Sequence, residues 1–214
     1  MKRITAITLL VITIFGGAIY SMTAQQSNRD IKAYERTAAL LGEHLGRPVF
    51  IRIIKEALVL ELWTQDEEQQ WQLMKSYPIL AMSGELGPKT KEGDKQAPEG
   101  FYEVRRGQLN PNSRFHLAFN IGYPNAYDRS LGRTGSFIMV HGSHYSIGCF
   151  AMGDDGIEEI YTMVAQALEQ GQVAVPVQIY PFKMTDERME KEKNHPAFPF
   201  WKGYLKEGWD ASPL

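Results

Sequence analysis

The chain has 214 residues, of which 43% are apolar and 22% are charged, and its formal net charge is −2. A chain this apolar and this weakly charged can bury a core and is not disordered, and the near-neutral balance gives no reason to expect a nucleic-acid partner. The single cysteine, Cys149, excludes an internal disulfide framework and a zinc site made of several thiolates.

The N-terminus has the pattern of an export signal. Lys2 and Arg3 precede an uncharged stretch over 4–20, and small polar residues follow as far as Ala24. We expect residues 1–24 to be a signal peptide, or else an uncleaved inner-membrane anchor; a buried helix of the domain is the third alternative. This pattern predicts a periplasmic protein that meets the membrane only through a retained N-terminal segment.

The next hundred residues contain a predicted helix, a meander and a long loop. Apolar residues spaced along one helical stripe predict a helix over 28–45. Segments rich in β-branched and aromatic residues predict an antiparallel meander of strands over 49–54, 57–63 and 71–79. The stretch 84–100 is too dense in glycine, proline and charge for either element, so we expect a long loop there.

The middle of the chain predicts two strands separated by a loop. Alternation of apolar and polar residues over 114–121 predicts a strand whose apolar side chains, beginning with Phe115, face the core. A glycine-rich segment, 122–135, predicts a loop, and a short buried strand is expected over 136–141.

The C-terminal third predicts one strong helix, a last strand and a helical tail. Apolar residues at helical spacing predict a helix over 156–170 behind a two-aspartate cap. Alternating valines predict a strand over 173–179, where Pro176 suggests the edge of a sheet. The tail reads as helical around 187–193 and 201–207.

The segment with the clearest chemical content joins a histidine to the cysteine. His141 ends the buried strand, and Cys149 follows Gly148 eight residues later. Thiol catalysis needs a base and backbone donors for the oxyanion, so the N–H groups of Gly148 and Cys149, with Ser146 nearby, are candidates for that role. A fully extended chain would hold the two side chains about 26 Å apart, and Gly142 and Gly148 allow the reversal that brings them together.

Residue types alone leave two other interpretations open. The first is a structural loop with a buried, unreactive thiol. The second is a metal site with His141, His144 and Cys149 as ligands and a carboxylate from Asp154 or Asp155.

Several segments resemble a known family. His-Gly at 141–142 followed by Ser-Ile-Gly-Cys at 146–149 resembles the signature of the L,D-transpeptidase (YkuD-type) catalytic domain. The segments 83–104, 115–125 and 177–209 resemble its short periplasmic subgroup, which is related to murein hydrolases that act on lipoprotein-linked peptidoglycan. Together these segments cover most of the chain after residue 24.

The resemblance implies a fold and a domain plan. We expect a mainly β protein with flanking helices, namely an L,D-transpeptidase-type β-sandwich with an N-terminal helix and a C-terminal helical tail. Residues 25–214 would form a single catalytic domain with its core at about 47–182.

The resemblance also implies a mechanism. Cys149 would be the nucleophile and form a thioester with a diaminopimelate-containing stem peptide of peptidoglycan. His141 would be the base, held by a backbone carbonyl, and Ser146, Gly148 and Gly142 would belong to the oxyanion loop. No cofactor and no metal are implied. Ile147 and Ala151 depart from the family signature on the side where an acceptor would approach.

The reaction that follows the thioester has alternatives. The subgroup favours hydrolysis, which would release a murein-linked lipoprotein or peptide, and transfer to an amine would instead form cross-links or attach lipoprotein. A catalytically silent cell-wall-binding module is the alternative of another class. The loops 84–100 and 122–135 are expected to wall the substrate groove. The candidate substrate contacts are His116, Asn120, Tyr123, Arg129 and Arg133.

Overall fold

The computed structural model describes residues 41–214. The predicted export segment 1–24 and nearly all of the helix predicted over 28–45 lie outside these residues. In the part that is described, no helix is both long and apolar enough to cross a membrane.

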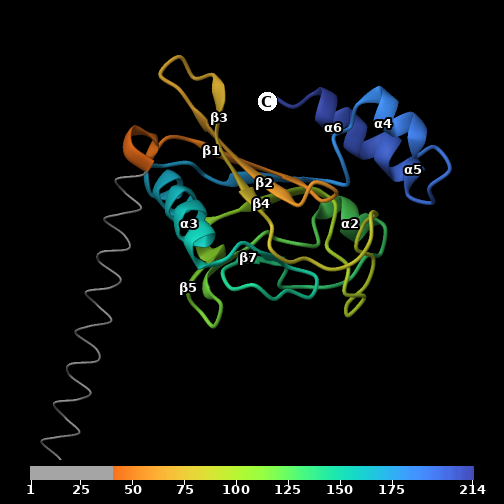
Figure 1. Cartoon of the computed structure of the whole chain (residues 1–214), viewed down its shortest axis with the longest axis horizontal. Helices are drawn as coiled ribbons and strands as arrows, with labels where there is room; N and C mark the ends of the chain where they lie inside the picture. The colour runs from red at the N-terminus through yellow and green to blue at the C-terminus, as the bar shows by residue number, and fades with distance from the viewer. Residues whose placement is uncertain (1–40) are drawn as a thin grey trace, which may run out of the picture. The chain divides into compact units, whose positions relative to one another are not determined.

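Two β-sheets form the body of the fold, and they lie in two layers (Figure 1). The first sheet has five strands in the order β3-β2-β1-β9-β4, and the second has four in the order β5-β6-β7-β8. The strands are β1 Val49–Ile54, β2 Val59–Gln65, β3 Trp71–Pro78, β4 Gly100–Val104, β5 Leu109–Ser113, β6 His116–Asn120, β7 Met139–His141, β8 Phe150–Ala151 and β9 Val175–Tyr180.

Helices flank the sheets, with α3 on one side and the C-terminal helices gathered on the other (Figure 1). The helices are η1 Gly42–His44, η2 Arg106–Gln108, α2 Ala126–Ser130, α3 Asp154–Glu169, α4 Asp186–Lys191, α5 Phe198–Phe200, the π-helical turn η3 Trp201–Leu205 and α6 Lys206–Asp210. The predicted mainly β class with flanking helices and a helical tail is therefore confirmed.

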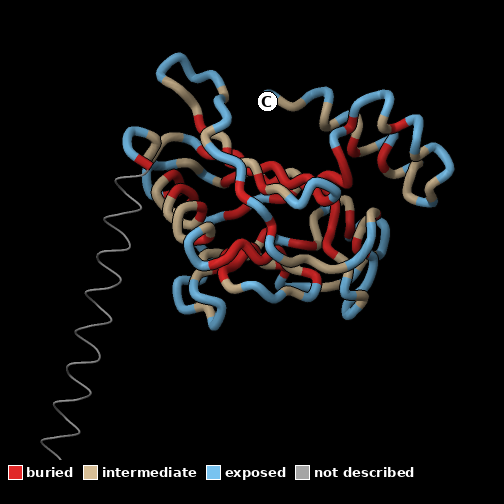
Figure 2. The backbone as a smooth tube through the Cα atoms, in the orientation of Figure 1, coloured by how far each residue is buried: buried red, intermediate tan, exposed pale blue. Residues whose placement is uncertain are grey.

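The predicted meander is present, and its strands differ in how they are buried. In β2 every second residue is buried, while all of β1 is buried. Antiparallel pairing joins β1 to β2 and β2 to β3. The buried parts of the tube concentrate where the two layers face each other (Figure 2).

The last strand is not an edge strand, contrary to the prediction from Pro176. β9 lies between β1, to which it is parallel, and β4, to which it is antiparallel. The ladder with β1 begins only at Val177, opposite Ile51, so the missing N–H of Pro176 precedes that ladder. Val173 lies outside the strand and is exposed.

The strand predicted over 114–121 is instead part of a hairpin. Residues 113–116 turn from β5 into β6, and Ser113 pairs with His116 across the turn. Phe115 therefore does not face the core and has 43% of its surface exposed, although Phe119 and Ile121 are fully buried as predicted.

Several short elements were not predicted, among them β5, β8, η2, β4 and α2. β4 begins at Gly100, the last residue of the predicted loop, and α2 lies within the loop predicted over 122–135. Asn125 caps α2 by accepting the N–H of Asp128 at 2.8 Å.

The predicted strong helix is α3, and it begins earlier than predicted. Its N-cap is Gly153, so the two aspartates stand in its first turn and do not precede it. Asp154 accepts the backbone N–H of Ser143 at 2.8 Å, which ties the helix to the loop after β7.

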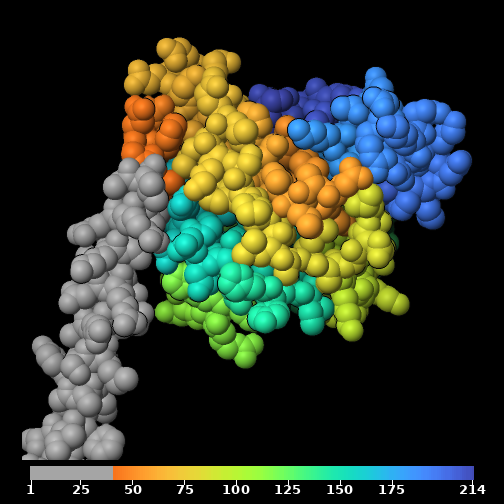
Figure 3. All heavy atoms as spheres, viewed as in Figure 1, coloured from red at the N-terminus to blue at the C-terminus, as the bar shows by residue number. Residues whose placement is uncertain are grey.

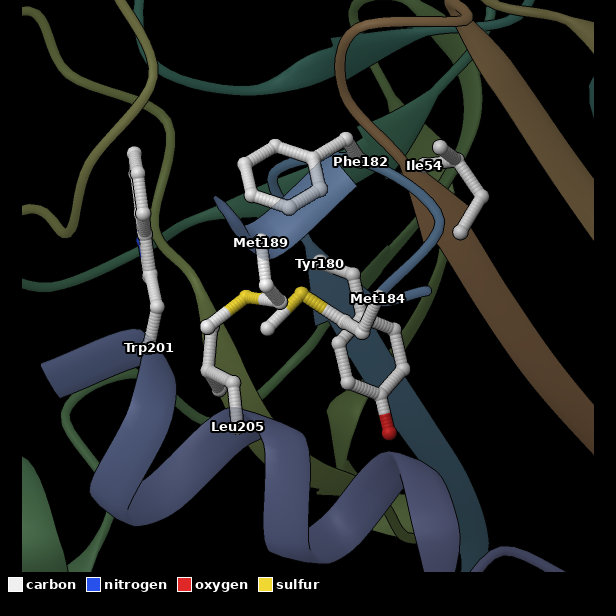
Figure 4. Packing of buried hydrophobic residues seen from close by; sticks show 7 residues of the cluster. All are labelled: Ile54, Tyr180, Phe182, Met184, Met189, Trp201 and Leu205. Atoms are coloured by element: carbon white, nitrogen blue, oxygen red, sulfur yellow. The ribbon is translucent and has the colours of Figure 1, made fainter. Parts of the chain in front are cut away.

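The C-terminal tail packs onto β1 and β9 through a buried apolar cluster (Figure 4). Trp201 lies edge-on to Phe182, with ring centres 5.2 Å apart. Thr185 caps α4 by accepting the N–H of Arg188 at 3.2 Å. The cluster consists of Ile54, Tyr180, Phe182, Met184, Met189, Trp201 and Leu205.

Candidate active site around Cys149 and His141

Parallel pairing of β7 with β8 brings the predicted cysteine and histidine side by side. Val140 pairs with Phe150 and His141 with Ala151, so the loop returns the chain beside its starting strand. Side chains alternate along a strand, and Cys149 directly precedes β8, so its side chain lies on the same face as that of His141. The buried Val140 and Phe150 occupy the opposite face.

The His141 ring is buried and held by a backbone carbonyl, as the sequence predicted. Its Nδ1 lies 2.6 Å from the carbonyl oxygen of Gly142. A carbonyl oxygen can only accept, so Nδ1 carries the hydrogen and Nε2 has a free lone pair. Burial lowers the pKa of His141, although the Gly142 carbonyl acts in the opposite direction. The ring is therefore a neutral base near neutral pH.

The Cys149 sulfur is partly buried and contacts the backbone of the strand beside it. Its Sγ accepts the N–H of Met139 at 3.3 Å and lies 3.6 Å from the carbonyl oxygen of Phe137. Burial raises the pKa of the Cys149 thiol, while the Met139 N–H and the charge of Lys89 act to lower it. Burial thus favours the neutral thiol at Cys149 and the neutral imidazole at His141.

The backbone donors around the sulfur differ in what they bind. The Gly148 N–H donates to Ser83 Oγ at 2.7 Å. Among residues 41–214, no acceptor is recorded for the Cys149 N–H, and Ser146 Oγ is buried without a hydrogen-bond partner. The role predicted for these donors in binding an oxyanion stays a prediction, with the Cys149 N–H as the donor that is unoccupied within the described chain.

The two glycines that bound this loop are required for different reasons. Gly148 has a φ of +83°, in the left-handed region that favours glycine. Gly142 has no such angle, but a Cβ there would lie 2.6 Å from the Phe115 carbonyl oxygen and 2.7 Å from Asp154 Oδ1. Gly142 thus allows close approach of the hairpin and α3 to the carbonyl that holds His141.

The long loop 84–100 lies beside the segment that carries Cys149, and its expected role as a wall of the substrate groove stays a prediction. The Ala151 carbonyl oxygen accepts the N–H of Leu80 at 2.8 Å, and the Ala151 N–H donates to the Ala81 carbonyl oxygen at 2.9 Å. Leu80 and Ala81 lead into the loop. In the space-filling view the yellow surface that includes the loop borders the teal surface that includes residues around 150 (Figure 3). Sequence analysis did not single out Ser83, whose contact with Gly148 depends on pairing across 65 residues.

Lys89 and Asp94 fix the outer part of this loop. Lys89 Nζ lies 2.5 Å from Asp94 Oδ1, and both side chains are largely buried. Burial alone would raise the pKa of Asp94, but Lys89 and the backbone N–H groups of Lys91, Thr90 and Gln96 lower it to about 2. Asp94 is therefore ionised, and it holds the Lys89 ammonium in place.

The five candidate substrate contacts are not gathered in one place. Asn120 and Arg129 line an open groove of about 810 Å³, together with Arg105, Tyr127 and Tyr204. The remaining three have partners within the fold. His116 Nε2 lies 2.8 Å from Glu158, Tyr123 is buried with its hydroxyl 3.2 Å from the Lys89 carbonyl oxygen, and Arg133 Nη1 lies 2.8 Å from the buried Asp128.

The residues of the alternative metal site have other positions. Asp154 Oδ1 accepts the Ser143 N–H, and the His144 side chain is exposed in the loop. Across the described residues, no three His, Cys, Asp or Glu side chains are placed to hold a metal ion.

A thiol and an imidazole lie on one sheet face, and the backbone N–H of Cys149 has no acceptor within the described part of the chain. This arrangement is suited to nucleophilic acyl chemistry. This is the class of site that the fold and geometry define.

Comparison with known proteins gives the family. The model of the L,D-transpeptidase catalytic domain (YkuD) matches residues 49–179. The chain is 50% identical over 166 residues to the Escherichia coli K12 protein described as "Putative L,D-transpeptidase YafK", covering 78% of this chain and 67% of that protein. The chain belongs to the L,D-transpeptidase catalytic domain family, as its sequence predicted, and membership supports an enzyme that acts on peptidoglycan.

A solved structure supports the fold. A point mutant of the helical cell shape determining protein Pgp2 from Campylobacter jejuni superimposes with a TM-score of 0.52 at 21% identity. The match covers 82% of this chain and 63% of the Pgp2 chain, so the present chain spans less than two thirds of that protein. The similarity extends to the fold alone.

Proposed function

We propose that the chain is a cysteine-dependent peptidoglycan hydrolase that releases a protein or peptide linked to murein. The substrate is an L-to-D peptide bond at the diaminopimelate of a stem peptide, and Cys149 is the nucleophile. The observation that carries the proposal is the orientation of His141, whose Nδ1 is held by the Gly142 carbonyl and whose Nε2 is left free on the face that Cys149 shares.

The first half-reaction forms a thioester. The thiol hydrogen turns from the Phe137 carbonyl toward His141 Nε2, which takes the proton as sulfur attacks the substrate carbonyl carbon. Negative charge develops on the carbonyl oxygen, where the Cys149 N–H can donate. Collapse of this intermediate breaks the C–N bond, and the leaving amine takes the proton from the imidazolium.

The second half-reaction consumes water. His141 removes a proton from water as the oxygen attacks the thioester carbonyl, and collapse breaks the C–S bond. The sulfur leaves as thiolate and takes the proton back from His141, which restores the thiol. The other product is a carboxylic acid, which ionises to the carboxylate by releasing its remaining proton to solvent. No cofactor enters either step.

The proposal is tested on sacculi that carry covalently linked lipoprotein. Intact-protein mass spectrometry should detect an acyl adduct on the parent chain and free lipoprotein with no new cross-links, and Cys149→Ala should give neither. Cys149→Ala as active as the parent would overturn the proposal. Binding of stem peptide without an adduct or product in the parent would instead favour a cell-wall-binding module.

The alternative is transpeptidation, in which an amine replaces water. It is favoured by the description of the 50% identical E. coli protein as an L,D-transpeptidase. The same assay with an added stem peptide as acceptor distinguishes the two reactions, because transfer yields a cross-linked product at the expense of the free carboxylate.

We further propose that the chain works in the periplasm. Support comes from the charged start, the apolar stretch over 4–20 and the small residues before position 24, together with a substrate that lies outside the inner membrane. Cell fractionation with an antibody to the chain tests this, and recovery in the cytoplasm would overturn it. N-terminal sequencing of the recovered protein distinguishes a cleaved signal peptide from a retained anchor.

A further inference from the structure

A buried ion pair lies where the two ends of the loop 84–100 approach each other. Lys55, just after β1, and Glu99, just before β4, have no exposed side-chain surface, and Lys55 Nζ lies 2.9 Å from Glu99 Oε1. Such a pair is stable only when its remaining hydrogen-bonding capacity is satisfied. Lys55 Nζ also contacts the carbonyl oxygens of Glu85, Gly87 and Ala97 at 3.0, 2.9 and 3.1 Å.

Trp201 of the C-terminal tail completes this arrangement. Its Nε1–H donates to Glu99 Oε2 at 2.7 Å, while the Gly87 N–H donates to Oε1 at 2.6 Å. Both carboxylate oxygens are thus occupied, one by the loop and one by the tail. We call Lys55, Glu99 and Trp201 the neck cluster.

The loop above the neck cluster reaches the nucleophile in two ways. Ser83 Oγ accepts the Gly148 N–H at 2.7 Å and donates to the Lys95 carbonyl at 2.6 Å, so it joins the loop to the residue before Cys149. Lys89, held by Asp94, acts electrostatically on the thiol. Movement of the neck cluster would therefore disturb both the hydrogen bond between Ser83 and Gly148 and the position of the Lys89 ammonium.

We propose that the neck cluster positions the nucleophile, so that the reactivity of Cys149 depends on the C-terminal tail. The cluster holds the two ends of the loop together, and the loop in turn keeps Ser83 and Lys89 beside the thiol. The proposal takes Cys149 as the nucleophile of the function proposed above, but it does not depend on which bond is cut. The three residues are positioning residues, since they act through the loop.

The decisive substitution is Trp201→Phe. It keeps an aromatic ring in the apolar cluster of Figure 4 and removes one N–H, which leaves Glu99 Oε2 buried without its donor. Glu99→Gln is the second variant, because it keeps the side-chain volume and removes the charge that Lys55 faces. Trp209→Phe is the matched control, since Trp209 lies in the same tail but packs on Tyr180 and Arg52.

The readout is the rate of Cys149 alkylation by iodoacetamide as a function of pH, measured on the full chain. Lys89 of the loop is the titratable side chain that acts on the thiol, and His141 of β7 lies on the same sheet face. Lys89 stabilises the thiolate, so loosening it moves the half-maximal rate to higher pH. We expect the rate at a fixed pH below the midpoint to fall about threefold or more, because a smaller fraction of the molecules carries the reactive thiolate.

Limited trypsin digestion gives a second readout that needs no catalysis. Lys91 and Lys95 are exposed in the loop, and we expect Trp201→Phe to be cut there under conditions where the parent is resistant. On a substrate that the parent turns over, kcat should fall while KM stays within about twofold, because the loss is in the nucleophile and not in uniform binding.

Two results would overturn the inference. One is an alkylation profile in folded Trp201→Phe and Glu99→Gln that matches the parent. The other is an equal shift in Trp209→Phe, since that would reflect general loosening of the tail. Alkylation needs no substrate, so this inference can fail while the parent still hydrolyses sacculi, and the proposed hydrolysis can fail while the shift is observed.

Discussion

Replacement of Gly142 by alanine tests whether close packing holds the general base. The added Cβ would lie 2.6 Å from the Phe115 carbonyl oxygen, 2.7 Å from Asp154 Oδ1 and 3.0 Å from Ile157 Cγ2. Ordinary contacts between such atoms are about 3.5 Å, so the backbone must shift by several tenths of an ångström against the hairpin and α3. The carbonyl that moves is the one bonded to His141 Nδ1.

We expect Gly142→Ala to lower the free energy of unfolding by about 2–3 kcal/mol, as overpacking in a dense core does. For a chain of this size that corresponds to a melting temperature roughly 5–10 °C lower. Differential scanning calorimetry measures the stability, and hydrolysis of sacculi at a temperature where the variant is folded measures the catalytic loss. We expect kcat to fall by at least about tenfold, since a misplaced base no longer reaches the thiol.

Gly203→Ala is the control for this substitution. Gly203 lies in the helical tail, has no heavy atom within 4 Å of its would-be Cβ and has no positive φ. Alanine there should be neutral or stabilise by up to about 1 kcal/mol. The reasoning is wrong if Gly142→Ala melts with the parent, or if it is destabilised no more than Gly203→Ala and keeps full activity.

Further expectations concern protonation and the reagents that stop the reaction. His141→Asn, which has no base, should lower kcat/KM on sacculi by about a hundredfold or more; a loss below tenfold would exclude general-base catalysis by this residue. Burial lowers the pKa of His141, so the acidic limb of the kcat/KM profile should lie below the ordinary value of 6.5, and a limb above 6.5 would contradict the assignment. The pKa of Asp94 falls from 3.8 to about 2 on folding, so its ionisation stabilises the fold above about pH 4 and ceases to do so as pH falls through 2. The stability difference between the parent and Asp94→Asn in urea should therefore shrink from about pH 4 toward pH 2, and a constant difference would show that the charge is not involved. Chelation by EDTA should leave hydrolysis unchanged while alkylation of Cys149 abolishes it, and loss on chelation would instead indicate a metal-dependent peptidase.

Elements with strong local patterns were predictable from the sequence. The meander strands are rich in β-branched and aromatic residues, and burial alternates along β2, while the residues of α3 repeat at helical spacing over four turns. The return of the chain from His141 to the strand that directly follows Cys149 was also predictable, because a glycine lies near each end of the short loop between them. These features depend on residues that are close together in the sequence.

Features that depend on which segments pair in the fold could not be predicted in this way. Phe115 continues an alternating pattern, yet the chain turns there because β5 pairs with β6. Pro176 suggests an edge strand, but its strand β9 is central because it pairs with β1, which lies more than a hundred residues earlier. Lys55 and Glu99 each read as ordinary surface charges until the fold buries them together. In each case tertiary pairing decides what a local pattern leaves open.

The central position of β9 has a consequence for how the chain acquires its fold. Until residues 175–180 are available, β1 and β4 each present an unpaired edge, and the tail that covers them comes later still. Long-range pairing of this kind slows folding, since loop closure must precede the contacts that stabilise it. The order of the strands therefore delays completion of the five-stranded sheet until β9 has been synthesised.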